Sequence, residues 1–221
     1  MSKDWSGNGN SIWKTLGASN HADAEREVDD YYATDPIAID KLLEVEKPHR
    51  FIWECACGGG HLSERLTERG YDVFNSDIKN RGYEKQHLVL DFLKQEGKLF
   101  SFEHDILTNP PYKYATEFVL KALELLHEGC KCYMFLKLTF LEGKRRYIEL
   151  FRDTPPRSVY VFSERVLCAK NAEFDRMREG GGSAVAYAWF VWQKGYTGTT
   201  EVRIVCSEFA PVQPTVREAA R

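Results

Sequence analysis

A short segment of the chain, DILTNPPY at residues 105–112, places an amide and a phenol on either side of two prolines. Consecutive prolines remove two backbone donors and fix two φ angles, and the first one favours an extended conformation for Asn109. The apolar residues that precede them are typical of a strand. We therefore expect a rigid strand end that holds Asn109, Pro110, Pro111 and Tyr112 in place to bind a ligand. A rigid turn that ends in an aromatic helix start is the plainer alternative.

A glycine-rich turn, ECACGGGHL at residues 54–62, provides the second set of candidate residues. It lacks the G-x-G-x-x-G pattern of dinucleotide sites and the G-K-[ST] of a P-loop, which weighs against both classes of nucleotide site. Gly58 and Gly60 permit positive φ angles and close approach of a ligand. Asp77 follows about twenty residues later, where an acid accepts hydrogen bonds from a ribose. With Asp91, these residues favour an adenosine-bearing cofactor over a tight turn followed by a capping acid.

The apolar periodicity along the chain alternates between strand and helix patterns, which indicates an α/β domain with a mostly parallel sheet. The expected strands are 50–55, 71–77, 87–92, 104–111, 130–138, 157–163, 184–195 and 201–206. The expected helices are 38–46, 61–70, 114–129 and 143–153. Right-handed crossovers place such helices on both faces of the sheet.

The candidate residues share one kind of position, because each set lies at the end of an expected strand. The glycine turn follows the first strand, Asp77 ends the second, Asp91 lies in the third and the NPPY segment follows the fourth. Ligands of open parallel sheets bind beyond the carboxyl ends of the strands, near the switch in strand order. This shared placement indicates a single site more strongly than any one motif does.

Size and charge limit the function classes. The 221 residues suit one domain with appendages: a polar arm or lid at 1–30, a domain at 31–210 and a tail at 211–221. The net charge of -3 and pI of about 6.1 are not the overall signature of a nucleic-acid binder. No apolar run approaches the ~20 residues of a membrane span, and the N-terminus lacks a secretory h-region. We therefore expect a cytoplasmic protein that does not bind membranes.

The six cysteines are expected to be thiols in a reducing compartment. Two C-x-C pairs, Cys55 with Cys57 and Cys130 with Cys132, invite a zinc interpretation. Structural zinc sites usually space their cysteines as C-x2-4-C, however, and each pair lies on or beside an apolar strand. Small buried thiols in the core are the simpler interpretation, and we expect no metal.

The motifs resemble those of the class I S-adenosylmethionine-dependent amino-methyltransferases. ECACGGG is similar to that family's first motif, D/E-x-x-x-G-x-G, and DILTNPPY to its catalytic motif, [DNS]-P-P-[YFW]. YYATDP at 31–36 resembles the segment that contacts the cofactor carboxylate. The order of motifs is that of the gamma class of DNA adenine methyltransferases, and the later strands resemble phage and prophage members. The resemblance covers about residues 30–193.

This resemblance implies a Rossmann-like sheet of about seven mostly parallel strands, helices on both faces and an antiparallel strand near the C-terminus. It implies S-adenosylmethionine as cofactor. The residues that it assigns to the cofactor are Thr34 at the carboxylate, Glu54, Ala56, Gly58 and Gly60 in the turn, Asp77 at the ribose, and Ile78, Asp91 and Phe92 around the adenine. Cys55 replaces the proline that many members carry after the acid.

The resemblance also explains the rigid segment. An exocyclic amine is a poor nucleophile because its lone pair is delocalised into the ring. Oxygens of Asn109 and of the Pro110 backbone can accept from both N–H groups and aim the lone pair at the methyl group, and preorganised dipoles stabilise the charge that develops on nitrogen. Tyr112 can stack on a flat base that has left its duplex. The step needs no strong general base.

The substrate is the least determined feature. We expect adenine N6 in DNA, while amines of RNA bases, protein glutamine and a non-catalytic nucleic-acid-binding module stay open as alternatives. Cytosine N4 enzymes usually carry serine in place of Asn109. Without a large C-terminal domain, target recognition would rest on the arm and on a flap at 164–184, which is alternatively a solvated connection.

Overall fold

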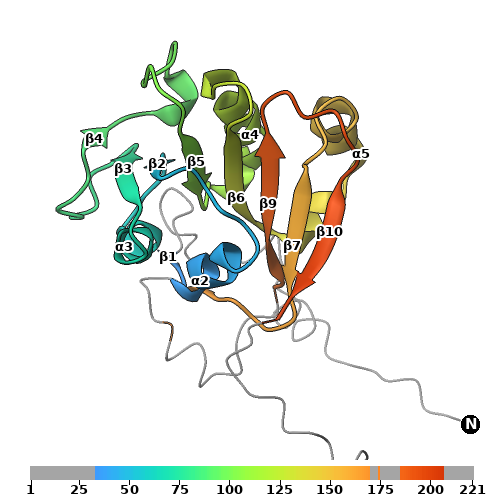
Figure 1. The fold of residues 1–221 in the computed structure, drawn as a ribbon, viewed down its shortest axis with the longest axis horizontal. Coiled ribbons are helices and arrows are strands. Elements are labelled where there is room, and N and C mark those ends of the chain that lie inside the picture. The colour runs from blue at the N-terminus through green and yellow to red at the C-terminus, as the bar shows by residue number, and fades with distance from the viewer. Residues whose placement is uncertain (1–32, 170–173, 175–184, 207–221) are drawn as a thin grey trace, which may run out of the picture.

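The computed structural model describes residues 33–169, 174 and 185–206, which form an eight-stranded sheet with helices on both faces (Figure 1). The expected arm at 1–30 and tail at 211–221 lie outside the described residues. Within the described part of the chain, no helix combines the length and apolar character that crossing a membrane requires.

The large sheet contains β2 Phe51–Glu54, β3 Asp72–Asp77, β4 Leu88–Val89, β5 Asp105–Thr108, β6 Lys131–Lys137, β7 Ser158–Phe162, β9 Tyr187–Gln193 and β10 Glu201–Val205. Its strand order is β10-β7-β9-β6-β5-β2-β3-β4. All neighbours pair in parallel except β9, which runs antiparallel to β6 and β7. The predicted fold class is confirmed, with eight strands in place of about seven.

The strand order reverses between β2 and β5. From β2 the chain moves outward to β3 and β4, and then returns to form β5 on the other side of β2. The register pairs Ile52 with Asp105 and Trp53 with Ile106, so the two strands run side by side. Open parallel sheets bind ligands at such a switch, beyond the carboxyl ends of the strands. The turn after β2 carries the glycines and the turn after β5 carries the NPPY segment.

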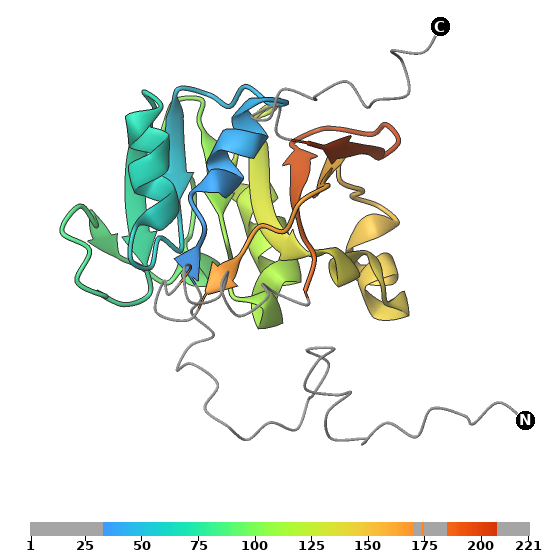
Figure 2. The same ribbon diagram turned by 90° about the horizontal axis from the view of Figure 1, so that it is seen from below.

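Helices cover both faces of the sheet. Helices α2 (Ile37–Leu43) and α3 (His61–Glu68) lie on one face, and α4 (Ala115–Leu125) and the short α5 (Lys144–Arg146) lie on the other (Figures 1 and 2). Gly60 precedes α3 with a φ of 80°, a left-handed conformation that glycine adopts without strain. The predicted placement of helices on both faces is therefore observed.

Successive residues of the central strands point into two different cores. On β6, Met134 and Leu136 pack in the cluster under α4, whereas Tyr133 and Phe135 pack in the cluster that includes α2 and α3. This alternation follows from the pleat of a strand, in which neighbouring side chains face opposite sides of the sheet. Since both faces are covered, the strand reads as a continuous apolar run in the sequence.

Most expected elements are shorter by a few residues, and two of them adopt another conformation over part of their predicted span. The strand expected at 87–92 is reduced to β4, because Asp91 accepts a hydrogen bond from the Leu93 backbone at 3.2 Å and caps a 3-10 turn over Phe92–Lys94. The helix expected at 143–153 consists of α5 and a π-helical segment, Tyr147–Phe151. Both differences lie at or next to element ends, where local capping bonds compete with the regular pattern.

Candidate active site

Asn109 lies directly after β5, and its amide nitrogen is held by two side chains from distant parts of the chain. Its Nδ2 donates to the Thr34 hydroxyl at 2.8 Å and contacts the Cys168 sulfur at 3.8 Å. Pro110 beside it is buried. The amide nitrogen of Asn109 thus faces Thr34 and Cys168. The amide oxygen, which the expected chemistry would use to accept a hydrogen bond from an amine, is the other polar atom of the side chain.

A two-stranded antiparallel sheet brings these partners to Asn109. Strand β1 (Ala33–Thr34) pairs with β8 (Cys168–Ala169), with Thr34 opposite Cys168 in the register. A further backbone bond joins the Asp35 N–H to the Leu167 carbonyl at 2.9 Å. We call residues 33–35 and 167–169 the clasp; its arrows lie side by side at the lower edge of Figure 2, blue and orange. The sequence pattern missed both strands, because two residues carry no periodicity.

The clasp occupies part of the segment that was expected to be a flap. Residues 164–169 are described, and Glu164 pairs with Lys41 of α2 at 3.1 Å, although the Lys41 side chain is only 2% exposed. Most of the remainder of 164–184 lies outside the described residues. The start of this segment therefore packs against the domain and contributes Cys168 to the site.

Tyr112 completes the group around Asn109. Its hydroxyl lies 3.4 Å from the Cys168 sulfur, its ring centroid lies 6.0 Å from that of Tyr187, and the Lys137 ammonium lies 4.9 Å from the centre of the Tyr112 ring. Burial raises the pKa of Tyr112 well above its ordinary value and raises that of Cys168 to about 11. Both groups are therefore neutral near pH 7, and the residues around Asn109 offer hydrogen bonds and an aromatic ring in place of a strong base.

The glycine turn and Asp77 meet directly. The Gly58 N–H donates to the Asp77 carboxylate at 2.9 Å, and the Lys79 N–H donates to the other oxygen at 3.0 Å. Gly58 has a φ of 53°. Asp77 is buried, and Ile78 next to it is 54% exposed. A buried acceptor beside an exposed apolar side chain suits a ligand with a polar sugar and a flat ring.

Gly60 is required for a second reason that the sequence did not reveal. A Cβ atom at this position would lie 2.3 Å from the ring of Tyr83, so a side chain here would strike that ring. Tyr83 comes from the loop between β3 and β4, and its hydroxyl donates to Glu64 of α3 at 2.9 Å. The ring thus packs on the glycine backbone, and any larger residue would displace it.

Glu54 lies beneath the turn, with 2% of its surface exposed. Ser63 Oγ contacts a Glu54 carboxylate oxygen, and it also contacts Asn75 Oδ1 at 2.6 Å. Burial and the nearby charge of Asp77 raise the pKa of Glu54 well above its ordinary range, and a hydrogen bond with the Ser63 backbone opposes this only in part. The Ser63 hydroxyl, which has one hydrogen, thus lies between two acceptors, the Glu54 carboxyl group and the Asn75 amide oxygen. Glu54 therefore joins the end of β2 to α3 and β3.

The remaining predicted residues occupy different surroundings. Asp91 caps the 3-10 turn and pairs with Lys94 at 3.1 Å, whereas Ala56 is half-buried after the end of β2.

Phe92 is a core residue, 2% exposed, whose ring centroid lies 5.2 Å from that of Trp53 and 5.0 Å from that of Phe118. The structure thus places two groups, one around Asn109 and one around Asp77, at the ends of β5 and β3, the strands on either side of β2 at the switch.

No protein-family model and no curated protein matches this sequence. Among solved structures, a modification subunit assigned to a type I restriction enzyme of Vibrio vulnificus YJ016 aligns at 13% identity and a TM-score of 0.53, over 88% of this chain and 50% of that one. A Listeria monocytogenes protein provisionally classed as a class I S-adenosylmethionine-dependent methyltransferase aligns at 12% identity and a TM-score of 0.50, over 83% of this chain and 66% of that one. This chain has the class I methyltransferase fold.

The class I methyltransferase fold is what these alignments establish, because identities of 12–13% carry no information on substrate. The chain spans half of the Vibrio protein and just under two thirds of the Listeria protein. An Agrobacterium tumefaciens protein provisionally classed as an O-methyltransferase aligns equally well, with a TM-score of 0.50 at 11% identity, over 78% of this chain and 85% of that one. The acceptor atom must therefore be inferred from the site itself.

Proposed function

We propose that the protein is an S-adenosylmethionine-dependent methyltransferase that methylates an exocyclic amine, with adenine N6 in DNA as the acceptor. The observation that carries this proposal is the position of Asn109. Its amide lies at the end of β5 with its nitrogen held by Thr34 at 2.8 Å, next to the strand whose turn carries the glycines. A merely structural turn would not need an amide fixed in this way at the switch of the sheet.

The residues after β2 and β3 fit the cofactor. Gly58 and Gly60 form the turn with positive φ angles of 53° and 80°, Asp77 offers a buried carboxylate for ribose hydroxyls, and Ile78 offers an exposed apolar surface for adenine. No lysine of a P-loop is present, in keeping with a ligand that has no phosphate chain. When bound, S-adenosylmethionine supplies a methyl group on a positively charged sulfur.

The residues after β5 fit the amine. In the proposed arrangement, Asn109 Oδ1 and the Pro110 carbonyl accept hydrogen bonds from the two N–H groups, which aims the nitrogen lone pair away from both oxygens. The two prolines restrict this geometry before substrate arrives, so little reorganisation is needed during the reaction. The neutral Tyr112 and Cys168 agree with a reaction in which oxygen dipoles, and no strong base, assist the nitrogen.

Aromatic surroundings support a flat acceptor. Tyr112 can stack on a base that has left its duplex, and Tyr187 and Lys137 lie around the Tyr112 ring. Asn109, in the place where cytosine N4 enzymes usually carry serine, favours adenine. Protein glutamine and RNA amines present similar N–H groups, and the experiment below separates them from DNA.

The test uses the purified full chain, methyl-tritiated cofactor and three acceptors: duplex DNA lacking N6-methyladenine, transcribed RNA and a protein extract. Mass spectrometry of nucleosides from labelled DNA identifies the modified atom. We expect N6-methyladenine in DNA, and no label with Asn109→Ala, which also controls for methyltransferases carried through purification. Label found only in RNA, or only in protein, would show that DNA is not the substrate and would identify the class of acceptor. No label in any acceptor, with cofactor binding shown by calorimetry, would favour the non-catalytic module.

A further inference from the structure

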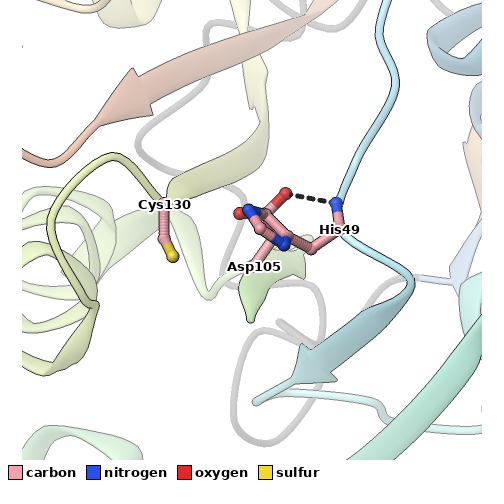
Figure 3. Close-up of side chains that lie close together, drawn as sticks. All are labelled: His49, Asp105 and Cys130. Carbon is pink, nitrogen blue, oxygen red and sulfur yellow. Dashed lines mark hydrogen bonds between the residues drawn. The ribbon is translucent and has the colours of Figure 1, made fainter. Parts of the chain in front are cut away.

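A cluster of three possible metal ligands lies at the amino-terminal edge of the sheet, the edge opposite the candidate active site. His49 precedes β2, Asp105 is the first residue of β5 and Cys130 immediately precedes β6 (Figure 3). These strands are neighbours in the order β6-β5-β2. Because adjacent parallel strands begin at the same edge, residues far apart in sequence meet there.

The geometry is close to that of a bound transition metal. One ligand atom from each residue lies within 4.8 Å of the other two. Around a tetrahedral Zn²⁺, bond lengths of about 2.0–2.3 Å place neighbouring ligand atoms about 3.3–3.8 Å apart. The three atoms would need to approach one another by at most about 1.5 Å. The His49 side chain is exposed, and its ring lies over the Asp105 carboxylate in Figure 3.

The Asp105 carboxylate is held in place by backbone groups. The His49 N–H donates to one oxygen at 2.8 Å, and the Lys131 N–H donates to the other at 2.7 Å. Each oxygen keeps a second lone pair, which a cation can use. Asp105 is 1% exposed, and a buried carboxylate is costly unless a positive charge lies nearby. Backbone bonds of this kind also fix the direction of a metal ligand.

Cys130 adds a soft ligand, and it is 1% exposed. An imidazole, a carboxylate and a thiolate together suit Zn²⁺ better than Mg²⁺ or Ca²⁺, which bind oxygen ligands.

We propose that His49, Asp105 and Cys130 bind one Zn²⁺ ion, with water at the fourth position, and that the ion stabilises the folded chain by joining the starts of β2, β5 and β6. Folding brings the three ligands together, so binding favours the folded state. The proposal departs from the sequence-based expectation of no metal, which considered only spacing within each C-x-C pair. Cys132 of the same pair lies in the core under α4 and takes no part. The site does not depend on the proposed methyl transfer.

The test is a titration of the metal-stripped full chain with Co²⁺, which replaces Zn²⁺ and reports its ligands by absorption. We expect one equivalent to bind, with a thiolate-to-cobalt charge-transfer band and the visible bands of a four-coordinate ion, and Zn²⁺ to displace it. Cys130→Ser should lose the charge-transfer band. His49→Ala should weaken binding at least about tenfold. Cys206→Ser removes a thiol that is exposed and lies outside the cluster, and should bind as the unaltered chain does.

His49→Ala keeps the test decisive if Cys130→Ser fails to fold, because His49 is exposed and its backbone bond to Asp105 is retained. The melting temperature provides a second measurement, since Zn²⁺ should raise it in the unaltered chain and much less in His49→Ala. A chain that binds no Co²⁺, gives no thiolate band, or binds equally well as His49→Ala would overturn the proposal.

Discussion

The two ends of strand β5 use polar side chains in opposite ways. Asn109, just beyond its carboxyl end, has its amide nitrogen held by side chains of the clasp, Thr34 and Cys168. Asp105, its first residue, accepts hydrogen bonds from the backbones of His49 and Lys131. At the carboxyl end of β5, side chains of the clasp orient the Asn109 amide. At the amino end, the Asp105 side chain holds the backbones of His49 and Lys131 in place.

This contrast shows how a parallel sheet separates function from stability. At the carboxyl edge, a change of the Asn109 amide removes its bonds to the clasp but no hydrogen bond between strands of the large sheet. At the amino edge, Asp105 connects the segment before β2 to the start of β6, so its loss leaves two part-buried backbone donors without their acceptor. Changes at the first edge should therefore lower the rate of methyl transfer, and changes at the second should lower the free energy of unfolding.

The largest expected effect is that of Asn109→Ala on methyl transfer. Removal of a preorganised acceptor typically lowers kcat by about 10²–10³-fold, and we expect a loss at least this large with little change in cofactor affinity or melting temperature. Initial rates with tritiated cofactor and calorimetric binding measure these quantities. Asn80→Ala, in an exposed turn, is the matched control and should keep its rate. An Asn109→Ala rate within threefold of the unaltered chain would exclude the proposed role.

Asp105→Ala tests the opposite edge. Loss of the shared acceptor of two backbone donors should lower the free energy of unfolding by about 2–4 kcal/mol, since each unsatisfied buried group costs about 1–3 kcal/mol. Urea unfolding in the presence of a chelator measures this without a metal contribution. Asp72→Ala removes an exposed pair with Arg50 and should cost less than about 1 kcal/mol. Equal losses for the two variants would contradict the role of Asp105 as the acceptor that holds two strands.

Thr34→Val separates two roles for Thr34. If its hydroxyl orients Asn109, loss of that hydrogen bond of about 1 kcal/mol should lower kcat by about five- to tenfold and leave the cofactor Kd unchanged. Thr34→Ser retains the hydroxyl and should keep most of the rate. A weaker cofactor Kd at an unaltered kcat would instead assign Thr34 to the cofactor carboxylate, as the family resemblance implies.

The smallest expected effect is a difference in pH dependence at Glu54, which lies below both candidate groups. Its pKa in the folded chain is raised above the unfolded value of about 4.3, so the folded chain binds more protons above that pH. Its contribution to stability is therefore complete below about pH 4.3 and falls as the pH rises toward the folded pKa.

Glu54→Gln mimics the protonated acid and removes this dependence. Relative to the variant, the unaltered chain should lose stability as the pH rises, by a fraction of the about 1.4 kcal/mol per pH unit that one proton allows. Urea midpoints of both proteins from pH 5 to pH 8 provide the measurement, and the other titrating groups cancel in the difference. A constant difference across this range would show that Glu54 does not titrate in it.

Much of the carboxyl edge was predictable because its residues are contiguous. NPPY and the glycine turn restrict the backbone locally, and the expected strand ends placed both on one edge. The direct contact of Gly58 with Asp77 is consistent with that placement. The position of Phe92, which the family resemblance assigns to the cofactor, depends on packing, since its ring lies between Trp53 and Phe118 in the core.

By itself, the sequence determined the α/β class, most strand and helix positions and the two motifs, because apolar periodicity, glycine and proline act over a few residues. Only the tertiary structure decided the partners: Thr34 and Cys168 for Asn109, Tyr83 for Gly60, and His49 and Cys130 beside Asp105. These pairs are separated by many residues, and no local pattern encodes them. They depend on strand order and register, which the chain fixes only when the whole sheet assembles.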